Sequence, residues 1–262
     1  MLGAVLLILV GSADVIRSYP RLIGRGSRVI LLTTVVWAGV ISLVVWGLGI
    51  ALWWVAIPLA VAILWVGLTS PADNTRASAG IVPAVGLFVA MLAFVGGDRT
   101  AITVRGFLVD WHSTTPSELV RDVPLPTLFL GVGVVLFAIE SANIVVRAAL
   151  RPAQADVVAA PRLDPVVRRW WSRAAREVPV ITDLRGGRLI GPLERLLIVA
   201  LTLAGFLPIV AGLFAAKGIV RFPEISSDGA NGSKAEYFLV GSLVSWTLAF
   251  AGAGLLWISA HS

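Results

Sequence analysis

Long runs of apolar residues, separated by short polar segments, extend over almost the whole chain. The longest run, Val29–Leu68, would measure roughly 60 Å as one helix, about twice the thickness of the hydrocarbon core of a bilayer. It must therefore turn back on itself, and Gly47 and Gly49 mark the turn because glycine tolerates tight backbone conformations. The pattern predicts two antiparallel helices, near residues 29–48 and 51–69.

Further apolar runs predict the other helices of a membrane bundle. They cover residues 2–16, 80–96 and 128–146, and two more spans form a C-terminal hairpin within residues 191–262. The run at 2–16 is shorter than the ~20 residues of a usual crossing. It is nevertheless predicted to be a membrane helix, because its positive charges follow the apolar run, whereas a signal peptide begins with them. The chain is thus predicted to be an all-α, polytopic transmembrane bundle of about seven spans.

Composition supports a membrane protein and excludes several kinds of chemistry. Hydrophobic residues make up 58% of the chain, charged residues 14%, and the mean hydropathy is +0.91, which is more apolar than a soluble domain of 262 residues. The chain has no cysteine, which excludes disulfides and thiolate metal sites, and only two histidines. No motif of a hydrolase, metalloprotease, phosphate-binding loop or dinucleotide site is present. We therefore predict no metal, no cofactor and no catalytic residue, and the sequence does not support an enzyme.

Basic residues predict the orientation. Arg147–Arg188 contains nine arginines and fewer acidic residues, an excess typical of cytoplasmic segments. With seven crossings, the arginines of Arg17–Arg28 and Arg76 also lie inside, the N-terminus lies outside and the C-terminus inside. The chain then divides into an N-terminal membrane region of about five helices (1–148), a basic cytoplasmic segment (149–190) and a C-terminal transmembrane hairpin (191–262).

The basic cytoplasmic segment contains a predicted amphipathic helix. Asp164 and Pro165 provide a capping side chain and a proline at the first helical position. Arginines and tryptophans then fall largely on opposite faces, at Arg168, Arg169, Trp170, Trp171, Arg173 and Arg176. Such a helix is typical of those that bind anionic lipid headgroups. The alternative is that it packs on the cytoplasmic ends of the other helices; a protein partner on this side is also considered, but not a nucleic acid.

Glu140 is the most costly residue within a predicted span, since a carboxylate in lipid costs about 3 kcal/mol. Asn143 and Arg147 follow at helical spacing and are expected on the same face. One hypothesis is a site that handles a proton or a cation, or that contacts a ligand. The other is a polar clasp between helices, in which Glu140 contacts Asp14 or a hydroxyl group on a neighbouring helix.

The C-terminal hairpin carries charges that are expected to mark its two membrane faces. Glu194 and Arg195 are assigned to one face, and Lys217, Arg221 and Glu236 to the other. Glu194 suits the third position of a helix, where a carboxylate accepts backbone N–H groups, or a ligand site at the cytoplasmic mouth. The second group suits an ion-paired clasp across the hairpin or a site for an anion or a lipid headgroup.

Several short motifs of this hairpin carry a resemblance. They are Leu189-Ile190-Gly191, Leu193-Glu194-Arg195, Ala215-Ala216-Lys217, Arg221-Phe222 and Glu236-Tyr237. This part, about the last quarter of the chain, resembles an uncharacterised family of bacterial integral membrane proteins. The resemblance implies a multi-pass protein of the cytoplasmic membrane with a special C-terminal hairpin, and it implies no activity.

Two functions follow as hypotheses. The first is a binding or scaffold module whose basic cytoplasmic segment holds anionic lipid or a protein partner. The second is a small transporter or channel-like protein that uses the intramembrane Glu140.

Overall fold

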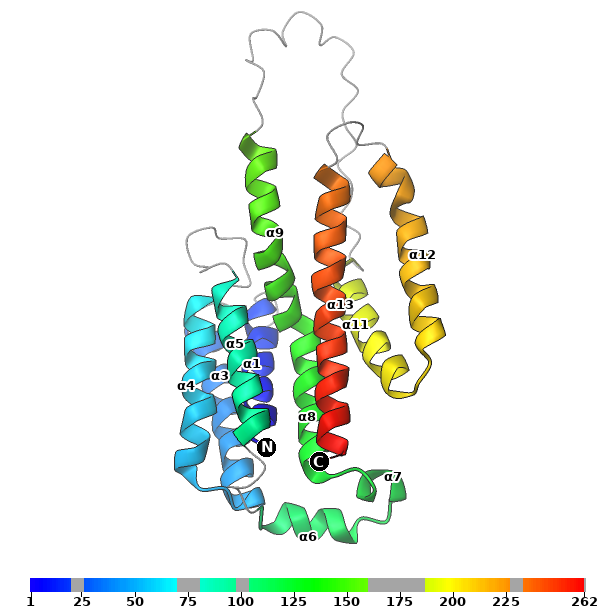
Figure 1. The fold of residues 1–262 in the computed structure, drawn as a ribbon. Coiled ribbons are helices and arrows are strands. Elements are labelled where there is room, and N and C mark those ends of the chain that lie inside the picture. Colours follow the sequence, from blue (N-terminus) through cyan, green and yellow to red (C-terminus); the bar gives the residue numbers. More distant parts are fainter. Residues whose placement is uncertain (20–25, 70–80, 98–103, 160–186, 227–232, 262) are drawn as a thin grey trace, which may run out of the picture.

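The computed structural model describes residues 1–19, 26–69, 81–97, 104–159, 187–226 and 233–261, and within these ranges every regular element is a helix. The predicted all-α architecture is confirmed. Figure 1 shows the longer helices standing side by side, with the short helices α6 and α7 at one end of the bundle. The membrane-region helices are α1 (Leu2–Ser18), α3 (Ser27–Ser42), α4 (Leu52–Leu68) and α5 (Val82–Gly97). The remaining helices are α6 (Phe107–Thr114), α7 (Glu118–Arg121), α8 (Leu125–Leu136), α9 (Ala142–Ala159), α11 (Gly187–Leu203), α12 (Leu207–Ser226) and α13 (Ser233–Ala260).

α1 is the central helix of the bundle. Every residue from Leu2 to Asp14 is buried, because this helix is apolar on all sides and packs on α3, α4, α5 and α8. Its closest neighbour is α8. A side-chain carbon added at Gly11 would lie 2.6 Å from Cβ of Leu136, and one added at Gly133 would lie 2.8 Å from Cβ of Leu7. Small residues thus allow the two backbones to approach, as is common between membrane helices.

The predicted pair of antiparallel helices within Val29–Leu68 is confirmed. α3 continues into a π-helix, η1 (Leu43–Gly47), and the chain then turns at Gly49, whose φ of 67° favours glycine, before α4 begins. The outward sides of α3 and α4 carry exposed apolar side chains such as Ile30, Leu31 and Leu64. Such faces suit contact with lipid.

Among the described residues, three helices are long and apolar enough to cross a membrane. They are Ser27–Gly47, Leu125–Leu150 and Ala235–Ala260; α4 and α5 are shorter apolar helices. The second of these contains the predicted span at 128–146 and is interrupted by a π-helix, η2 (Phe137–Ser141), between α8 and α9. The structure therefore supports a membrane protein by the length and composition of its helices.

The first of the two spans predicted within residues 191–262, which would run over residues 191–222, is not one continuous helix. The helix breaks at Ala204–Phe206, where Gly205 has a φ of 78° and the N–H of Phe206 bonds to the carbonyl of Leu201. α11 and α12 form a hairpin, and α12 runs back toward the end of the bundle at which α11 begins (Figure 1). Glu194 and Lys217, expected at opposite membrane faces, therefore lie together.

The termini also differ from the prediction. Figure 1 places the N-terminus and the end of α13 at the same end of the bundle, the end at which α6 lies. The sequence argument placed them on opposite sides because it counted residues 191–222 as a full crossing. Because α11 and α12 form a hairpin, α13 runs back along the bundle to the end at which the N-terminus lies.

Candidate functional site

The π-helix η2, between α8 and α9, provides a backbone carbonyl for a polar contact with another helix. A π-turn is wider than an α-turn and changes which backbone carbonyls are bonded within the helix. Here the carbonyl oxygen of Ala138 accepts a hydrogen bond from Nε of Arg195 on α11, at 2.9 Å. The backbone irregularity of η2 therefore joins α8–α9 to the α11–α12 hairpin.

Arg195 is 2% exposed and is held by groups from several helices. Its Nη2 donates to Oδ1 of Asn143 on α9 at 2.6 Å, and its Nη1 donates to Oγ of Ser245 on α13 at 3.3 Å. Glu140, which lies in η2 and is also 2% exposed, interacts electrostatically with this guanidinium. The buried carboxylate singled out in the sequence is thus within electrostatic reach of a cation from α11, whose charge also interacts with Glu194. We call Glu140, Asn143, Arg195 and Ser245 the arginine cluster.

A second cluster lies on the other side of α11. The Nζ atom of Lys217 on α12 donates to both carboxylate oxygens of Glu194, at 2.8 and 2.7 Å. Nε1 of Trp246 on α13 donates to the same carboxylate at 2.8 Å, and Lys217 lies 5.5 Å from the centre of the Trp246 ring. Phe214 stacks on that ring with 3.9 Å between centroids. We call Glu194, Lys217 and Trp246 the hairpin clamp.

The two clusters are coupled through neighbouring residues. Glu194 and Arg195 are consecutive on α11, and Ser245 and Trp246 are consecutive on α13. Consecutive side chains point about 100° apart on an α-helix. One residue of each pair therefore joins the arginine cluster and the other joins the hairpin clamp, so that α9, α11, α12 and α13 are held together at one level.

A third polar group lies between α1 and α4. Asp14 is fully buried, bonds to Arg17 on its own helix and accepts a hydrogen bond from Nε1 of Trp65 at 2.9 Å. Nη1 of Arg17 donates to the carbonyls of Val66 and Thr69, both at 2.9 Å. These are carbonyls at the C-terminal end of α4, which has no further turn to bond them. This group ties the two helices together.

Several site predictions need correction. Asp14 pairs with Arg17 and Trp65 and not with Glu140. Arg147, expected beside Glu140 and Asn143, is exposed and is not part of the arginine cluster. Lys217 pairs with Glu194 across the α11–α12 hairpin, a partner that the sequence argument did not predict. The clasp that includes Arg221 and Glu236 stays a prediction.

Other predicted residues fall elsewhere. Arg221 and Glu236 are exposed, near the end of α12 and at the start of α13. The amphipathic helix of the basic segment lies outside the described residues. Sequence reasoning missed Ser245 and Trp246, because a serine and a tryptophan in an apolar helix are ordinary in membrane proteins.

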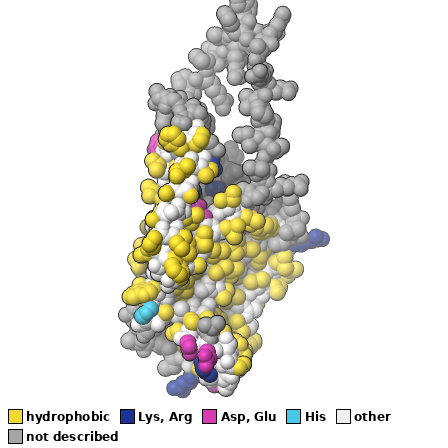
Figure 2. All heavy atoms as spheres, turned by 90° about the vertical axis from the view of Figure 1, so that its right-hand side faces the viewer, with side chains coloured by type: hydrophobic (Ala, Val, Ile, Leu, Met, Phe, Trp, Pro, Cys, Tyr) yellow, Lys and Arg dark blue, Asp and Glu magenta, His cyan; other side chains and the backbone are white. Residues whose placement is uncertain are grey.

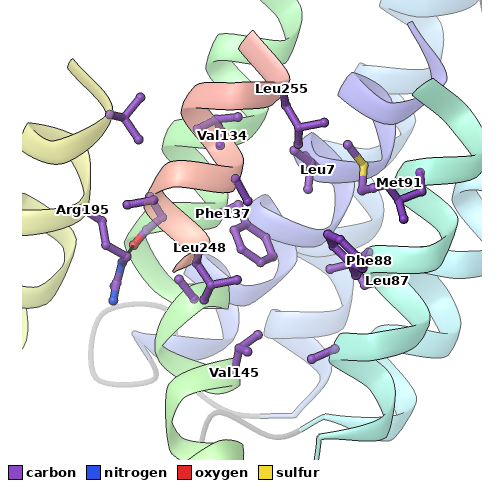
Figure 3. A pocket seen from close by; sticks show the side chains of 18 residues that line it. Leu7, Leu87, Phe88, Met91, Val134, Phe137, Val145, Arg195, Leu248 and Leu255 are labelled. Atoms are coloured by element: carbon purple, nitrogen blue, oxygen red, sulfur yellow. Dashed lines mark hydrogen bonds between the residues drawn. The ribbon is translucent and has the colours of Figure 1, made fainter. Parts of the chain in front are cut away.

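An apolar cavity of about 120 Å³ lies next to the arginine cluster. Figure 3 shows it between α5 on one side and α8–α9 and α13 on the other, with Phe137 pointing into it. Its walls are apolar side chains and a glycine, among them Leu7, Leu87, Met91, Val134 and Leu248. Among the described residues that line it, Arg195 alone is charged, and its guanidinium is engaged in the arginine cluster. The cavity therefore offers apolar surface and little else to a ligand.

The comparisons with known proteins add no identity. No family model matches the chain, and neither does any curated protein or solved structure. Among the residues that the structure describes, no group of three or more His, Asp or Glu residues could hold a metal ion.

Proposed function

We propose that this protein is a multi-pass membrane protein that binds an apolar molecule within the bilayer, in the cavity beside the arginine cluster. The observation that carries the proposal is the cavity itself. It is lined by side chains of α1, α5, α8–α9, α11 and α13, lies among apolar helices, and presents almost no polar surface. Ligand sites are commonly largely pre-formed apolar cavities between helices of a bundle.

The membrane topology that goes with this proposal has six crossings. They are α1, α3 with η1, α4, α5, α8 with α9, and α13; the α11–α12 hairpin enters the membrane and returns to the same side. Of the 21 Lys and Arg residues, only Arg99, Arg105 and Arg121 lie in the segment between α5 and α8. The positive-inside rule therefore favours the opposite end, with the basic segment, as cytoplasmic, and it favours both termini outside.

The surroundings of Glu140 favour a binding protein over the alternative, a transporter. A carboxylate that carries protons or cations must change its charge or its partners during the cycle, and it usually faces a wet path. Glu140 is instead buried beside Arg195, whose donors also bond to Ala138, Asn143 and Ser245. This arrangement supports a permanent clasp between helices.

The proposal is tested by filling the cavity. Ala84 lines it on α5, and Gly86, two residues away, has open space around it. We expect the purified wild-type protein and Gly86→Phe to retain an apolar molecule that organic extraction and mass spectrometry detect at about one per chain. Ala84→Phe should lose it while its thermal unfolding midpoint stays close to that of Gly86→Phe. Equal retention by the two variants, or none by the wild type, would contradict the proposal.

The basic cytoplasmic segment stays a separate prediction. Its arginines are expected to bind vesicles that contain anionic lipid, and Arg168→Glu with Arg169→Glu should weaken that binding in the intact protein. Unchanged association would remove the surface-helix hypothesis and would leave the cavity proposal untouched.

A further inference from the structure

We infer that the molecule in the cavity is the hydrocarbon chain of a bilayer lipid, which enters sideways between α5 and α13 from the leaflet on the side of the basic segment. This inference rests on the proposed function and names the chemical class of its ligand.

The length of the cavity is the first argument. Its lining residues on α5 run from Ala84 to Leu92, about 12 Å along the helix, and those on α8–α9 run from Val134 to Val145, about 16 Å. Half of a ~30 Å hydrocarbon core is about 15 Å, the depth of one leaflet. A cavity whose lining extends this far along the helices fits an extended chain better than a compact molecule.

The second argument is the side on which the cavity opens. Phe88 and Leu92 line it and are nevertheless 56% and 54% exposed, so part of its wall faces outward. α5 packs on α1 and α4, and Figure 3 shows the space between α5 and α13 bounded by side chains of both. A lipid chain can thus reach the cavity from within the membrane without crossing a polar surface.

The position along α5 indicates the leaflet. Ala84 is two residues from Val82, the first residue of α5, at the end of the bundle from which α9 leads into the basic segment. The cavity thus begins near that membrane face and extends inward to Met91 and Leu92.

Polar groups at the cavity argue against a ligand with an internal charge. The guanidinium of Arg195 has Ala138, Asn143 and Ser245 as hydrogen-bond partners, and Glu140 lies close enough to interact with its charge. A charged ligand group inside would have to displace one of these. A hydrocarbon chain leaves the arginine cluster intact and keeps its headgroup at the membrane surface.

The experiment uses the full-length protein in phosphatidylcholine vesicles with a trace of phospholipid that carries a photoreactive diazirine near the end of one acyl chain. We expect crosslinks to α5 and α13 near Met91 and Leu255, and we expect excess unlabelled lipid to compete with them. Leu92→Trp should narrow the opening and lower the crosslink yield at least fivefold. Val89→Trp is the matched control, because Val89 is 58% exposed on the same helix and does not line the cavity; its yield should equal that of the wild type.

Each outcome is informative. Equal yields for Leu92→Trp and Val89→Trp would overturn the inference. A rigid polycyclic photoprobe is compared with the acyl-chain probe. If the polycyclic probe labels the wild-type cavity but not that of Ala84→Phe, and the acyl-chain probe labels neither, the inference fails and the proposed function stands. If neither reagent labels the cavity and extraction finds no bound molecule, both fail.

Discussion

Arg195 and Glu140 are both buried, and their opposite charges interact between helices. A buried charge without a partner is costly, whereas a pair with well-placed hydrogen bonds is tolerated. Arg195 has five N–H donors, and a backbone carbonyl, an amide and a hydroxyl accept three of its hydrogen bonds. The free-energy cost of burying Glu140 among apolar residues is therefore reduced by Arg195, which lies more than fifty positions away in the sequence. No local sequence pattern could reveal that interaction.

The first prediction concerns this pair. Glu140→Gln removes one of the two carboxylates whose charges act on the guanidinium of Arg195, Glu194 being the other, and should reduce the free energy of unfolding by roughly 1–3 kcal/mol. The double variant Glu140→Gln with Arg195→Gln removes both charges and should lose clearly less than the sum of the two single variants. Denaturant unfolding in detergent measures all three, with the exposed Glu236→Gln as the neutral control.

The same variants decide between the clasp and the transporter. In liposomes, Glu140→Gln should show the same proton and cation flux as the wild type, because the clasp carries nothing. The transport hypothesis would be restored by two results together. The wild type would show a flux that Glu140→Gln lacks, and the unfolding free energy lost in the double variant would equal the sum of the losses in the two single variants.

The second prediction concerns the hairpin clamp. Lys217→Gln removes the ion pair with Glu194, whose side chain is nearly buried, and should cost about 2 kcal/mol, the range for hydrogen bonds to charged groups. The loss should be local, since α12 packs mainly on α11 and α13. Hydrogen exchange should become faster in α12 and stay unchanged in α3. Lys217→Arg keeps the charge and should restore much of the protection; uniform acceleration over the whole bundle would contradict a local clamp.

At the scale of elements, the apolar pattern predicted most helices but not every turn. The turn within Val29–Leu68 was found because no bilayer accommodates a helix of that length. The break at Ala204–Phe206 was missed because residues 191–222 fit a single span, and glycine and proline such as Gly205 and Pro208 are tolerated inside membrane helices. The charges at Glu194 and Lys217 gave no help, since they suit a crossing and a returning hairpin equally well.

The central place of α1 also lay beyond the sequence. The run at residues 2–16 is short and apolar, which describes a peripheral helix as well as a core one. What distinguishes it is the pairing of Gly11 with Leu136 and of Gly133 with Leu7, contacts between residues more than a hundred positions apart. The local sequence pattern predicts where a helix forms, but it does not predict which other helix packs against it.

The third prediction follows from that packing. A Cβ at Gly11 would lie 2.8 Å from the backbone carbonyl carbon of Leu136, which cannot move aside as a side chain would. Gly11→Ala should therefore lower stability by roughly 1–3 kcal/mol, the usual cost of overpacking. Gly39→Ala on α3 is the matched control. No atom lies within 4 Å of its added carbon, and alanine's higher helix propensity should make it neutral or slightly stabilising. Thermal unfolding midpoints in detergent compare the two, and equal midpoints would show that α1 and α8 can separate without cost.

At the scale of the whole molecule, the number of crossings fixes where the termini lie. The face in Figure 2, on the side of α12, is largely covered with hydrophobic side chains, and charged side chains gather at the end where α6 and α7 lie. Such a surface suits a lipid-facing band between polar ends. In the topology that we propose, α11 and α12 return to one side, so the chain crosses six times, and an even number of crossings places both termini on the same side.

The last prediction tests this topology. The chain has no native cysteine, so single cysteines report their side of the membrane to an impermeant thiol reagent. Ser113→Cys in α6 and Ser262→Cys beyond α13 should both be labelled in intact cells. Ser172→Cys, between α9 and α11, should be labelled only after the membrane is opened, and the buried Ala253→Cys only after denaturation. If Ser262→Cys behaves like Ser172→Cys while Ser113→Cys is labelled from outside, the termini lie on opposite sides. The chain then crosses once more than the returning hairpin allows.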